Sequence, residues 1–429
     1  MTLLPRLLVC PLLACALAVV AGCPDVLTPP VVPPPPDDAP ACVQSPGPRQ
    51  VKLLTRAELD RTLRDLLADP TAPATALLPP ETAIIGFEND ADNHRATSLM
   101  VEDLLRMAED VAARALAERR DLVLPCDPAA IGEAVCGAAF IDDLGPRAFR
   151  RPLSAGERDR LLGLFQASQA AYGFEEAVRL TLVTLLVSPA FLYRVDLGTP
   201  VDGSEADVAL ASAYEMASRL SYFLWGTMPD AELFDAAARG ELLDAAGVEV
   251  QARRMLDTPD GQAKARQAVG SFFRQWLGLE RINDVTKDAA TFPEYATELN
   301  GNWRDSLLAY VENVVFDGTG TLEELFTSPT LYVDATLAAL YNVDGADHVG
   351  FEPTTAPEGS RAGLLTQPGL MALLANPDQS SPIRRGVFVR EKILCQPIEL
   401  SMRTSSEGSA ITSRAGRAAS ALVRLITMT

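Results

Sequence analysis

The spacing of hydrophobic residues along this chain is helical over most of its length. After residue 55, apolar side chains recur every three or four residues, so that they share one face of a helix. That face carries Leu59, Leu63, Leu66 and Leu67. Thr55-Arg-Ala-Glu58 reads as a capping box, in which the Thr55 hydroxyl and the Glu58 carboxylate each accept a backbone N–H of the first turn. The pattern predicts a helix that begins at Thr55 and buries its leucine face.

The same signals predict helices along the rest of the chain. Ser154-Ala-Gly-Glu157 repeats the capping box, and Ser381-Pro382 places proline in a first helical turn, where its missing N–H costs nothing. Gly226 and Gly240 are expected to end helices. Helical periodicity also covers residues 97–119, 173–187, 205–225, 230–240, 245–257, 260–277 and 300–316. Because no sustained two-residue alternation appears, we expect an all-α fold of roughly a dozen helices, with irregular segments near 70–95 and 343–362.

Shifts in composition divide the chain into seven segments. We expect a lipoprotein signal peptide at 1–22, a lipidated cysteine with a proline-rich linker at 23–50, helical modules at 51–125, 126–200 and 201–342, a C-terminal module at 343–398 and an atypical tail at 399–429. Of the 31 residues in the tail, ten are Ser or Thr, and four Arg stand against two Glu. This composition departs from that of the modules before it. We interpret the tail as the product of a frameshift or truncation, with a genuinely divergent tail as the alternative.

The N-terminus has the pattern of an exported lipoprotein. Arg6 supplies a positive charge ahead of an apolar run at 7–22, which Pro11 interrupts. A permanent membrane-spanning helix is the alternative, but it needs about 20 apolar residues without an early proline. Val20-Ala-Gly-Cys23 resembles a bacterial lipobox, so we expect lipidation at Cys23 and localisation in the bacterial cell envelope, at the outer membrane. Residues 24–48 hold ten prolines and form either an extended tether or a segment wrapped on the folded part.

The remaining cysteines indicate disulfide bonding, as expected outside the cytoplasm. Cys126 and Cys136 are ten residues apart between helical stretches, and we expect them to pair. Cys42 and Cys395 are left over; they pair with each other, or Cys395 pairs with a cysteine lost from the C-terminus. No Cys-x-x-Cys occurs, so the chain as given has neither a zinc ribbon nor a covalent haem attachment site.

Charge and composition exclude several classes of function. The chain is 429 residues long with 37 Lys and Arg against 57 Asp and Glu, a net charge of −20, which argues against nucleic-acid binding. Only two histidines occur, His94 and His348, so multi-histidine metal sites are ruled out and we assign no metal-ligating residue. His94 lies in a polar loop whose spacing departs from the EF-hand pattern, so we interpret it as structural rather than calcium-binding.

The search for catalytic chemistry returns no assignment. The nucleophile elbow, the zinc-protease helix and the phosphate-binding loop are all missing from the sequence. Three adjacent acidic pairs favour solvated helix starts over acid–base catalysis: Asp142-Asp143, Glu175-Glu176 and Glu323-Glu324. Arg150-Arg151 and Arg384-Arg385 bind either interdomain carboxylates, which we favour, or an anionic ligand. We therefore name no catalytic residue.

A series of motifs resembles one known family. The most specific is Arg219-Leu-Ser-Tyr-Phe-Leu-Trp-Gly-Thr-Met-Pro-Asp-Ala-Glu-Leu233. Others lie at 53–67, 86–91, 147–153, 188–194, 275–279, 361–365 and 378–386. Together they resemble the planctomycete-cytochrome-associated family of unknown function, found in planctomycetes and myxobacteria. The residues that carry the resemblance include Arg150, Arg151, Trp225, Gly226, Pro229, Asp230, Arg385 and Gly386.

The resemblance implies an exported, multi-module, largely α-helical protein. Relatives of this type usually carry a C-terminal haem-attachment module, which implies a cytochrome-linked redox role, and some are associated with carbohydrate-binding modules. This chain has no such haem motif, so we expect no cofactor in it and haem only in a missing C-terminal module. Two hypotheses follow. The first is a lipid-anchored binding or scaffold component whose partners are the membrane and a haem protein or another exported protein. The second is a surface enzyme or binding protein acting on polymeric carbohydrate.

Overall fold

The computed structural model describes residues 49–83, 86–92, 95–201, 208–357, 359–396 and 398. Several predictions fall outside the described residues: the expected signal peptide, Cys23, the proline-rich linker up to residue 48, Cys42, His94 and the 399–429 tail. Within them the fold is predominantly all-α, as predicted. The helices outnumber the expected dozen because several are only one or two turns long.

The helices of the first part of the fold share one hydrophobic core, to which all but the short helix at Pro128–Ile131 contribute buried side chains. These helices are α2 (Arg56–Leu67), α3 (Pro73–Leu77), α4 (Ser98–Glu118), α5 (Arg120–Val123), α6 (Pro128–Ile131), α7 (Glu133–Phe149), α8 (Ala155–Tyr172), α9 (Phe174–Leu186) and α10 (Pro189–Leu192). The capping boxes at Thr55 and Ser154 both form, and α2 buries its leucine face as predicted. The segment near 70–95 is largely irregular but includes α3.

A second, smaller core lies among α11 (Ala213–Leu224), α12 (Ala231–Ala238), a 3-10 turn η1 (Glu241–Leu243), α13 (Ala245–Asp257) and α14 (Pro259–Leu277). The prediction that the first of these helices starts at residue 205 is wrong. It starts at Ala213, because Ser212 and Glu215 form a capping box that the periodicity did not reveal. Gly226 and Gly240 follow the ends of α11 and α12 with positive φ angles, as expected of helix stops.

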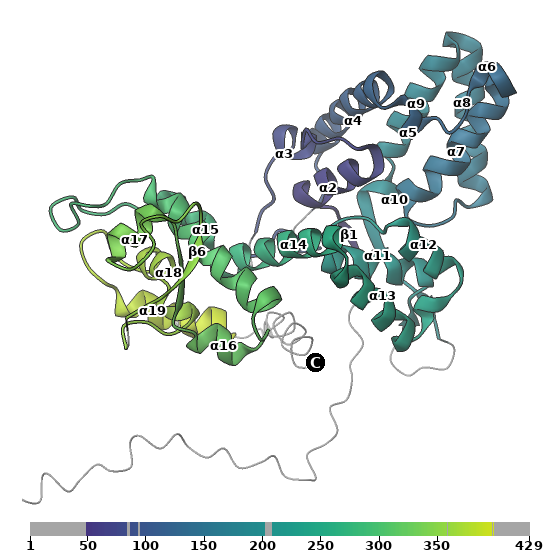
Figure 1. The fold of residues 1–429 in the computed structure, drawn as a ribbon. Coiled ribbons are helices and arrows are strands. Elements are labelled where there is room, and N and C mark those ends of the chain that lie inside the picture. Colours follow the sequence, from purple (N-terminus) through teal and green to yellow (C-terminus); the bar gives the residue numbers. More distant parts are fainter. Residues whose placement is uncertain are drawn as a thin grey trace, which may run out of the picture. The chain divides into compact units, whose positions relative to one another are not determined.

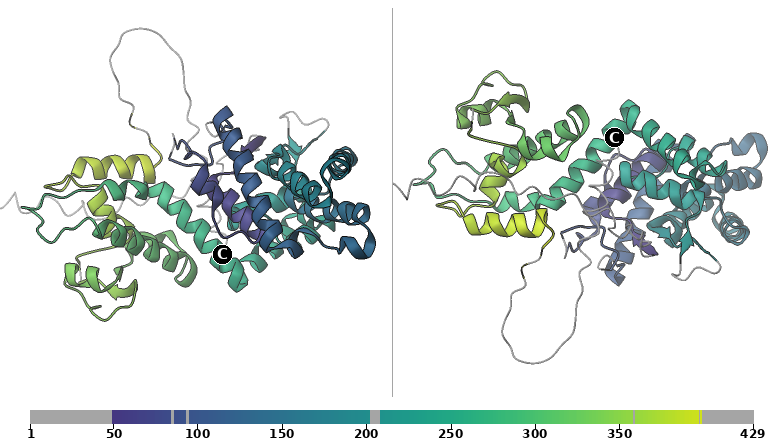
Figure 2. Two further views of the ribbon diagram at one scale, coloured as in Figure 1. Left: turned by 90° about the horizontal axis from the view of Figure 1, so that it is seen from above. Right: turned by 90° about the horizontal axis from the view of Figure 1, so that it is seen from below.

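The C-terminal part has the third core. It contains η2 (Leu279–Asp284), α15 (Leu299–Glu312), a π turn η3 (Asn313–Asp317), α16 (Leu322–Thr327), α17 (Ala335–Tyr341), η4 (Leu364–Thr366), α18 (Pro368–Leu373), α19 (Pro382–Phe388) and a second π turn η5 (Val389–Ile393). Helix α14 connects two cores, since Ala265 in its first half packs in the second core, whereas Phe273 and Leu277 near its end pack in the third. The teal helix between the purple-to-teal and the green-to-yellow helices in Figures 1 and 2 is α14.

The described strands form three short antiparallel pairs. Strand β1 (Gln50–Leu53) pairs with β2 (Tyr193–Asp196), β3 (Thr199–Pro200) with β4 (Ala209–Leu210), and β5 (Thr330–Val333) with β6 (Glu352–Thr355). The first pair joins the start of the described chain to the segment after α10, with Val51 opposite Val195. Within the described ranges, no helix is both long and apolar enough to cross a membrane.

Candidate functional site

The turn between α11 and α12 holds the centre of the most specific motif. Trp225 is 2% exposed and its indole Nε1 donates to the carbonyl oxygen of Met255 on α13, at 3.2 Å. Gly226 has φ +63°, and its carbonyl oxygen accepts a hydrogen bond from Arg61 Nε on α2, at 2.8 Å. An alanine here would be strained, and its Cβ would lie 2.6 Å from the Arg61 guanidinium. The turn is therefore fixed between α2 and α13.

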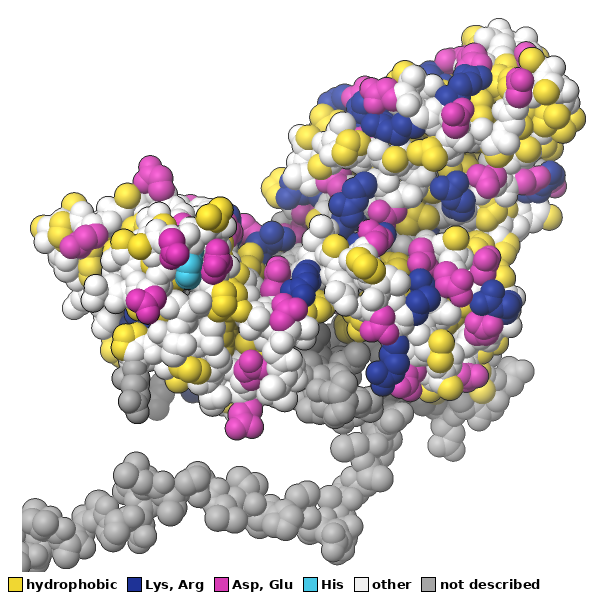
Figure 3. Space-filling model, viewed as in Figure 1, with side chains coloured by type: hydrophobic (Ala, Val, Ile, Leu, Met, Phe, Trp, Pro, Cys, Tyr) yellow, Lys and Arg dark blue, Asp and Glu magenta, His cyan; other side chains and the backbone are white. Residues whose placement is uncertain are grey.

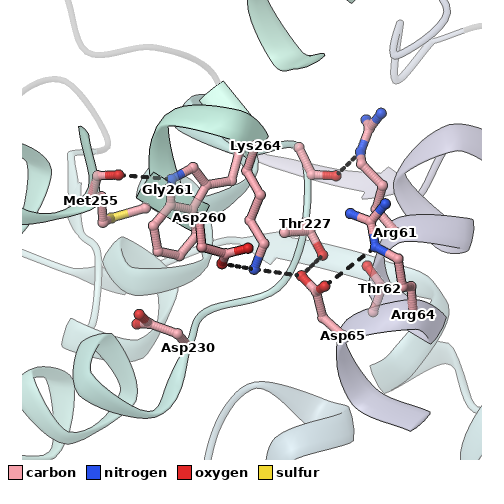
Figure 4. Close-up of polar contacts among 12 residues, drawn as sticks. Arg61, Thr62, Arg64, Asp65, Thr227, Asp230, Met255, Asp260, Gly261 and Lys264 are labelled. Carbon is pink, nitrogen blue, oxygen red and sulfur yellow. Dashed lines mark hydrogen bonds and ion pairs between the residues drawn. The ribbon is translucent and has the colours of Figure 1, made fainter. Parts of the chain in front are cut away.

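A partly buried ion pair lies under this turn. Asp65 on α2 accepts a hydrogen bond from the Thr227 hydroxyl at 2.9 Å, and its Oδ2 lies 3.2 Å from the Lys264 Nζ on α14. The Lys264 ammonium also lies 3.1 Å from Asp260 Oδ2 and 5.2 Å from the centre of the Trp225 ring. Figure 4 shows Lys264 held between the two carboxylates. The motif turn, α2 and α14 are thus tied together by one charged side chain.

Asp230 does two structural jobs at the end of the same turn. Its carboxylate accepts the Leu233 backbone N–H at 2.9 Å and so caps α12. Both of its oxygens also bind the Arg254 guanidinium of α13, at 2.8 and 2.9 Å. Pro229 before it is buried. These contacts give the motif aspartate a structural role, because Asp230 both caps α12 and binds it to α13.

A pocket of about 400 Å³ opens beside these residues. Its lining comes from four helices and the turn: Asp65, Arg147, Met228, Pro229, Asp230, Ala231, Phe234, Asp235 and Lys264. Arg147 donates to the Leu66 carbonyl and to Asp143, both at 3.2 Å. Asp235 is exposed; its carboxylate accepts no hydrogen bond from the described residues, and its charge interacts with that of Arg239, one helical turn further along the chain. The pocket thus combines charges held in close ion pairs with one exposed carboxylate that accepts no hydrogen bond from the described residues.

Arg150 is a structural residue and not an interdomain anion binder. It is 3% exposed, and its guanidinium donates to four backbone carbonyls instead of carboxylates: those of Ala148, Ala190, Phe191 and Tyr193. The guanidinium also lies 5.7 Å from the centre of the buried Tyr222 ring. Burial raises the pKa of the Tyr222 hydroxyl, against the lowering effect of Arg150. The expectation of a carboxylate partner for Arg150 is therefore wrong.

Arg151 binds a carboxylate, but within its own module. Its guanidinium makes two hydrogen bonds to Glu157, at 2.9 and 2.8 Å. Glu157 also completes the capping box of α8 with Ser154. The Arg151 guanidinium and then the Ser154 bonds hold the pKa of Glu157 at about 2, against the raising effect of partial burial. This contact stabilises the α7–α8 connection.

The second arginine pair also lacks the expected carboxylates. Arg384 donates to the Ala375 carbonyl at 3.1 Å. Arg385, on α19, has a buried Nε atom without a hydrogen-bond partner in the described part of the chain. Gly386 is exposed. Neither arginine forms an ion pair with a described carboxylate, so the preference for interdomain carboxylates is wrong for this pair too.

The acidic pairs mostly bind neighbouring side chains. Asp142 pairs with Arg158, Asp143 with Arg147, Glu175 with Arg120 and Glu176 with Arg179, while Glu324 accepts from Thr319. Acidic and basic side chains are correspondingly interspersed on the face shown in Figure 3. The expected helix starts are confirmed for Glu175-Glu176 and Glu323-Glu324, which lie in the first turns of α9 and α16. Asp142-Asp143 lies in the middle of α7, so the helix start expected there is wrong, although both side chains have basic partners. No cluster of three or more His, Cys, Asp or Glu that could hold a metal occurs in the described ranges.

The cysteine predictions have separate outcomes. The Cys126–Cys136 disulfide is confirmed, and it joins the segment before α6 to the first turn of α7. Cys395 is a free cysteine, so the pairing proposed for it with Cys42 is not seen; Cys42 is outside the described residues.

Two other motifs meet each other across the fold. Phe87 stacks on Phe272 of α14 with ring centres 5.7 Å apart, and the Glu88 backbone N–H donates to Gln275 Oε1 at 2.9 Å. Phe272 in turn stacks on Trp276 at 5.8 Å. Sequence reasoning identified both motifs separately, but nothing in the spacing indicated that they touch. The same holds for Asp65 and Lys264, which are 199 residues apart in the chain.

These contacts define the class of protein: an all-α, multi-domain protein in which short motifs fasten helices of different domains together. Sequence models of four families match successive parts of the chain, each described as a protein of unknown function. They are PSD3 (DUF1587) at residues 52–117, PSD5 (DUF1595) at 136–196, PSD4 (DUF1592) at 211–343 and PSCyt3 (DUF1588) at 361–421. The chain therefore belongs to the planctomycete-cytochrome-associated family of unknown function.

The four matches cover most of the described residues, and the last match extends beyond residue 398, where the described part of the chain ends. The PSCyt3 match continues to residue 421 and so includes much of the compositionally atypical tail. Comparison with curated proteins gave no match, and comparison with solved structures gave none.

Proposed function

We propose that this protein is a lipid-anchored component of the bacterial cell envelope, whose helical body is a scaffold or binding module for a cytochrome-type electron-transfer system. The single observation that supports the scaffold role is that residues of the family motifs make contacts between domains. Residues of the 52–117 domain bind the turn of the 211–343 domain through Arg61–Gly226 and Asp65–Thr227. Motif residues thus hold one domain to another.

The anchoring part of the proposal rests on Cys23 and the segments around it. The lipobox-like sequence supplies an acylation site, and two or three acyl chains hold a protein on a bilayer essentially permanently. The Cys126–Cys136 disulfide fits an oxidising compartment, where such bonds persist. The proline-rich segment at 24–48 then spans up to about 75 Å if fully extended, at about 3.1 Å per residue.

The electron-transfer part rests on family membership. Because the 429 residues contain no Cys-x-x-Cys-His sequence, the haem of this proposal is carried by a partner or by a further module. The experiment is affinity purification of the full-length, tagged protein from envelope membranes of the organism that carries it, followed by a haem spectrum of the eluate. We expect haem to co-purify in stoichiometric amount and a salt wash to release it. An eluate without haem, from a protein that is folded and membrane-bound, would contradict this part of the proposal.

Hydrolysis of carbohydrate by a carboxylate pair is the weaker candidate. It requires one carboxyl group that delivers a proton and a second that is free to act as nucleophile or base. In the pocket beside the motif, Asp65 is bound to Thr227 and Lys264, and Asp230 is bound to Arg254. These carboxylates are already engaged as structural acceptors, so the geometry favours binding over hydrolysis there.

A further inference from the structure

We propose that the pocket beside the Trp225–Asp230 turn is a binding site for a neutral polyhydroxylated ligand, such as a single sugar unit. The inference is independent of the cytochrome link and of the lipid anchor. Its first basis is position: Asp65 comes from the 52–117 domain, Arg147 from the 136–196 domain, and Asp235 and Lys264 from the 211–343 domain. Ligand sites form preferentially where domains meet.

The second basis is the balance of charge in the lining. Lys264 is matched by Asp65 and Asp260, and Arg147 by Asp143. Asp230 is matched by Arg254 in the same way. A ligand with a strong charge of its own would have to displace one of these ion pairs and leave a partly buried charge without its partner. A hydroxyl group avoids this cost, because it donates to a carboxylate and accepts from an N–H without changing the charge balance.

The third basis is the exposed carboxylate of Asp235 on α12. It accepts no hydrogen bond from the described residues, and its charge interacts with that of Arg239, one helical turn further along the chain. An ionised carboxylate has about four acceptor positions on two oxygens, so it can take two neighbouring hydroxyl protons at once. Hydrogen bonds to a charged group contribute about 1.5–3 kcal/mol each, more than those between neutral groups. Asp235 is thus the residue that provides most of the polar recognition.

The fourth basis is the apolar wall and the size of the pocket. Phe234, Met228 and Pro229 line it together, and the Phe234 ring is held by Tyr214, with ring centres 5.1 Å apart. The C–H face of a sugar ring packs on such a surface while its hydroxyls face the charged groups. The volume of about 400 Å³ is at the small end of ligand pockets, which run from about 300 to 1,000 Å³. This fits one or two sugar units.

The experiment measures binding to the full-length protein, purified in a detergent without a sugar head group. Saturation-transfer NMR and calorimetry are run with glucose, galactose, mannose, xylose and N-acetylglucosamine, and with glucosamine and glucuronate as charged probes. We expect at least one neutral sugar to bind, with an affinity that does not change with salt. Asp235→Asn should weaken that binding by about tenfold or more.

The matched control is Glu232→Gln, which removes an exposed carboxylate from the same helix but outside the pocket lining. It should bind the neutral sugar as the native protein does. Binding of glucosamine or glucuronate alone would overturn the proposal in favour of an ion site. Failure of every neutral probe to bind the folded protein, or equal weakening by Glu232→Gln and Asp235→Asn, would also overturn it. None of these results depends on haem or on membrane attachment.

Discussion

Replacement of Asp65 by Asn tests the ion pair under the motif turn while leaving the shape of the side chain unchanged. The Asp65 and Lys264 side chains are 18% and 16% exposed. Loss of one partner costs about 3–5 kcal/mol for a fully buried pair and about 0.2–1 kcal/mol for an exposed one. Because these side chains lie between the two limits and Lys264 keeps Asp260, we expect a loss of about 1.5–3 kcal/mol in the free energy of unfolding.

The assay is urea unfolding followed by tryptophan fluorescence and circular dichroism together. Lys264→Met keeps the aliphatic stem over Trp225 while removing the charge, and the double variant closes a thermodynamic cycle. We expect a coupling free energy of about 1 kcal/mol or more between positions 65 and 264. Asp235→Asn is the control, because it removes an exposed carboxylate that accepts no hydrogen bond from the described residues and should change stability by less than about 0.5 kcal/mol. A coupling near zero, or an Asp65→Asn variant as stable as the native protein, would refute the reasoning.

Three further predictions concern the helix connections. Gly226→Ala should lower the free energy of unfolding by about 2–3 kcal/mol, because φ is +63° at this position and the new Cβ displaces Arg61. The control is Gly163→Ala, whose Cβ meets no neighbour and which should not be destabilising in the same urea series. Replacing Cys126 and Cys136 by Ser should cost about 2–3 kcal/mol in thermal unfolding, and a reductant should then have no further effect, unlike in the native protein. The pKa of Glu157 is lowered, so its contribution to the stability of the fold is present above pH 4.5 and lost toward pH 2. The Glu157→Gln variant should therefore be less stable than the native protein by about 1–2 kcal/mol at pH 7. A difference in stability that does not shrink in acid would count against this assignment.

The sequence predicted helices well where residues close in the chain determine both where the helix begins and where it ends. The helix expected at 245–257 is α13 with the same bounds, and the capping boxes at Thr55 and Ser154 form as expected because their partners are three residues apart. The start of α11 was missed because apolar residues before Ser212 continue the helical spacing. The backbone at Ser212 is nevertheless extended, and its capping box makes the helix begin at Ala213. The short strand pairs were missed too, since two to four residues are too few for an alternation to appear.

The candidate site was predictable only in part. The Trp225–Asp230 motif identified the right turn, and Asp230 before a helix is a recognisable cap. What the motif binds was not predictable, because Arg61, Arg254 and Lys264 come from helices whose order in space depends on packing and not on sequence spacing. Arg150 shows the same limit: two adjacent arginines suggested carboxylate partners, whereas burial at a helix end turned one of them toward carbonyl groups.

Cys23 is where the account of an envelope lipoprotein is tested most directly. The measurement is the mass of the N-terminal peptide of the full-length protein produced in a Gram-negative host, combined with flotation of its membranes, for the native chain and for Cys23→Ser. We expect the mature chain to begin at a Cys23 that carries a diacylglycerol and an amide-linked acyl chain, and to float with membranes, whereas Cys23→Ser keeps its signal peptide unprocessed at this position. A native chain that begins elsewhere, or that begins at Cys23 without lipid, would contradict the account.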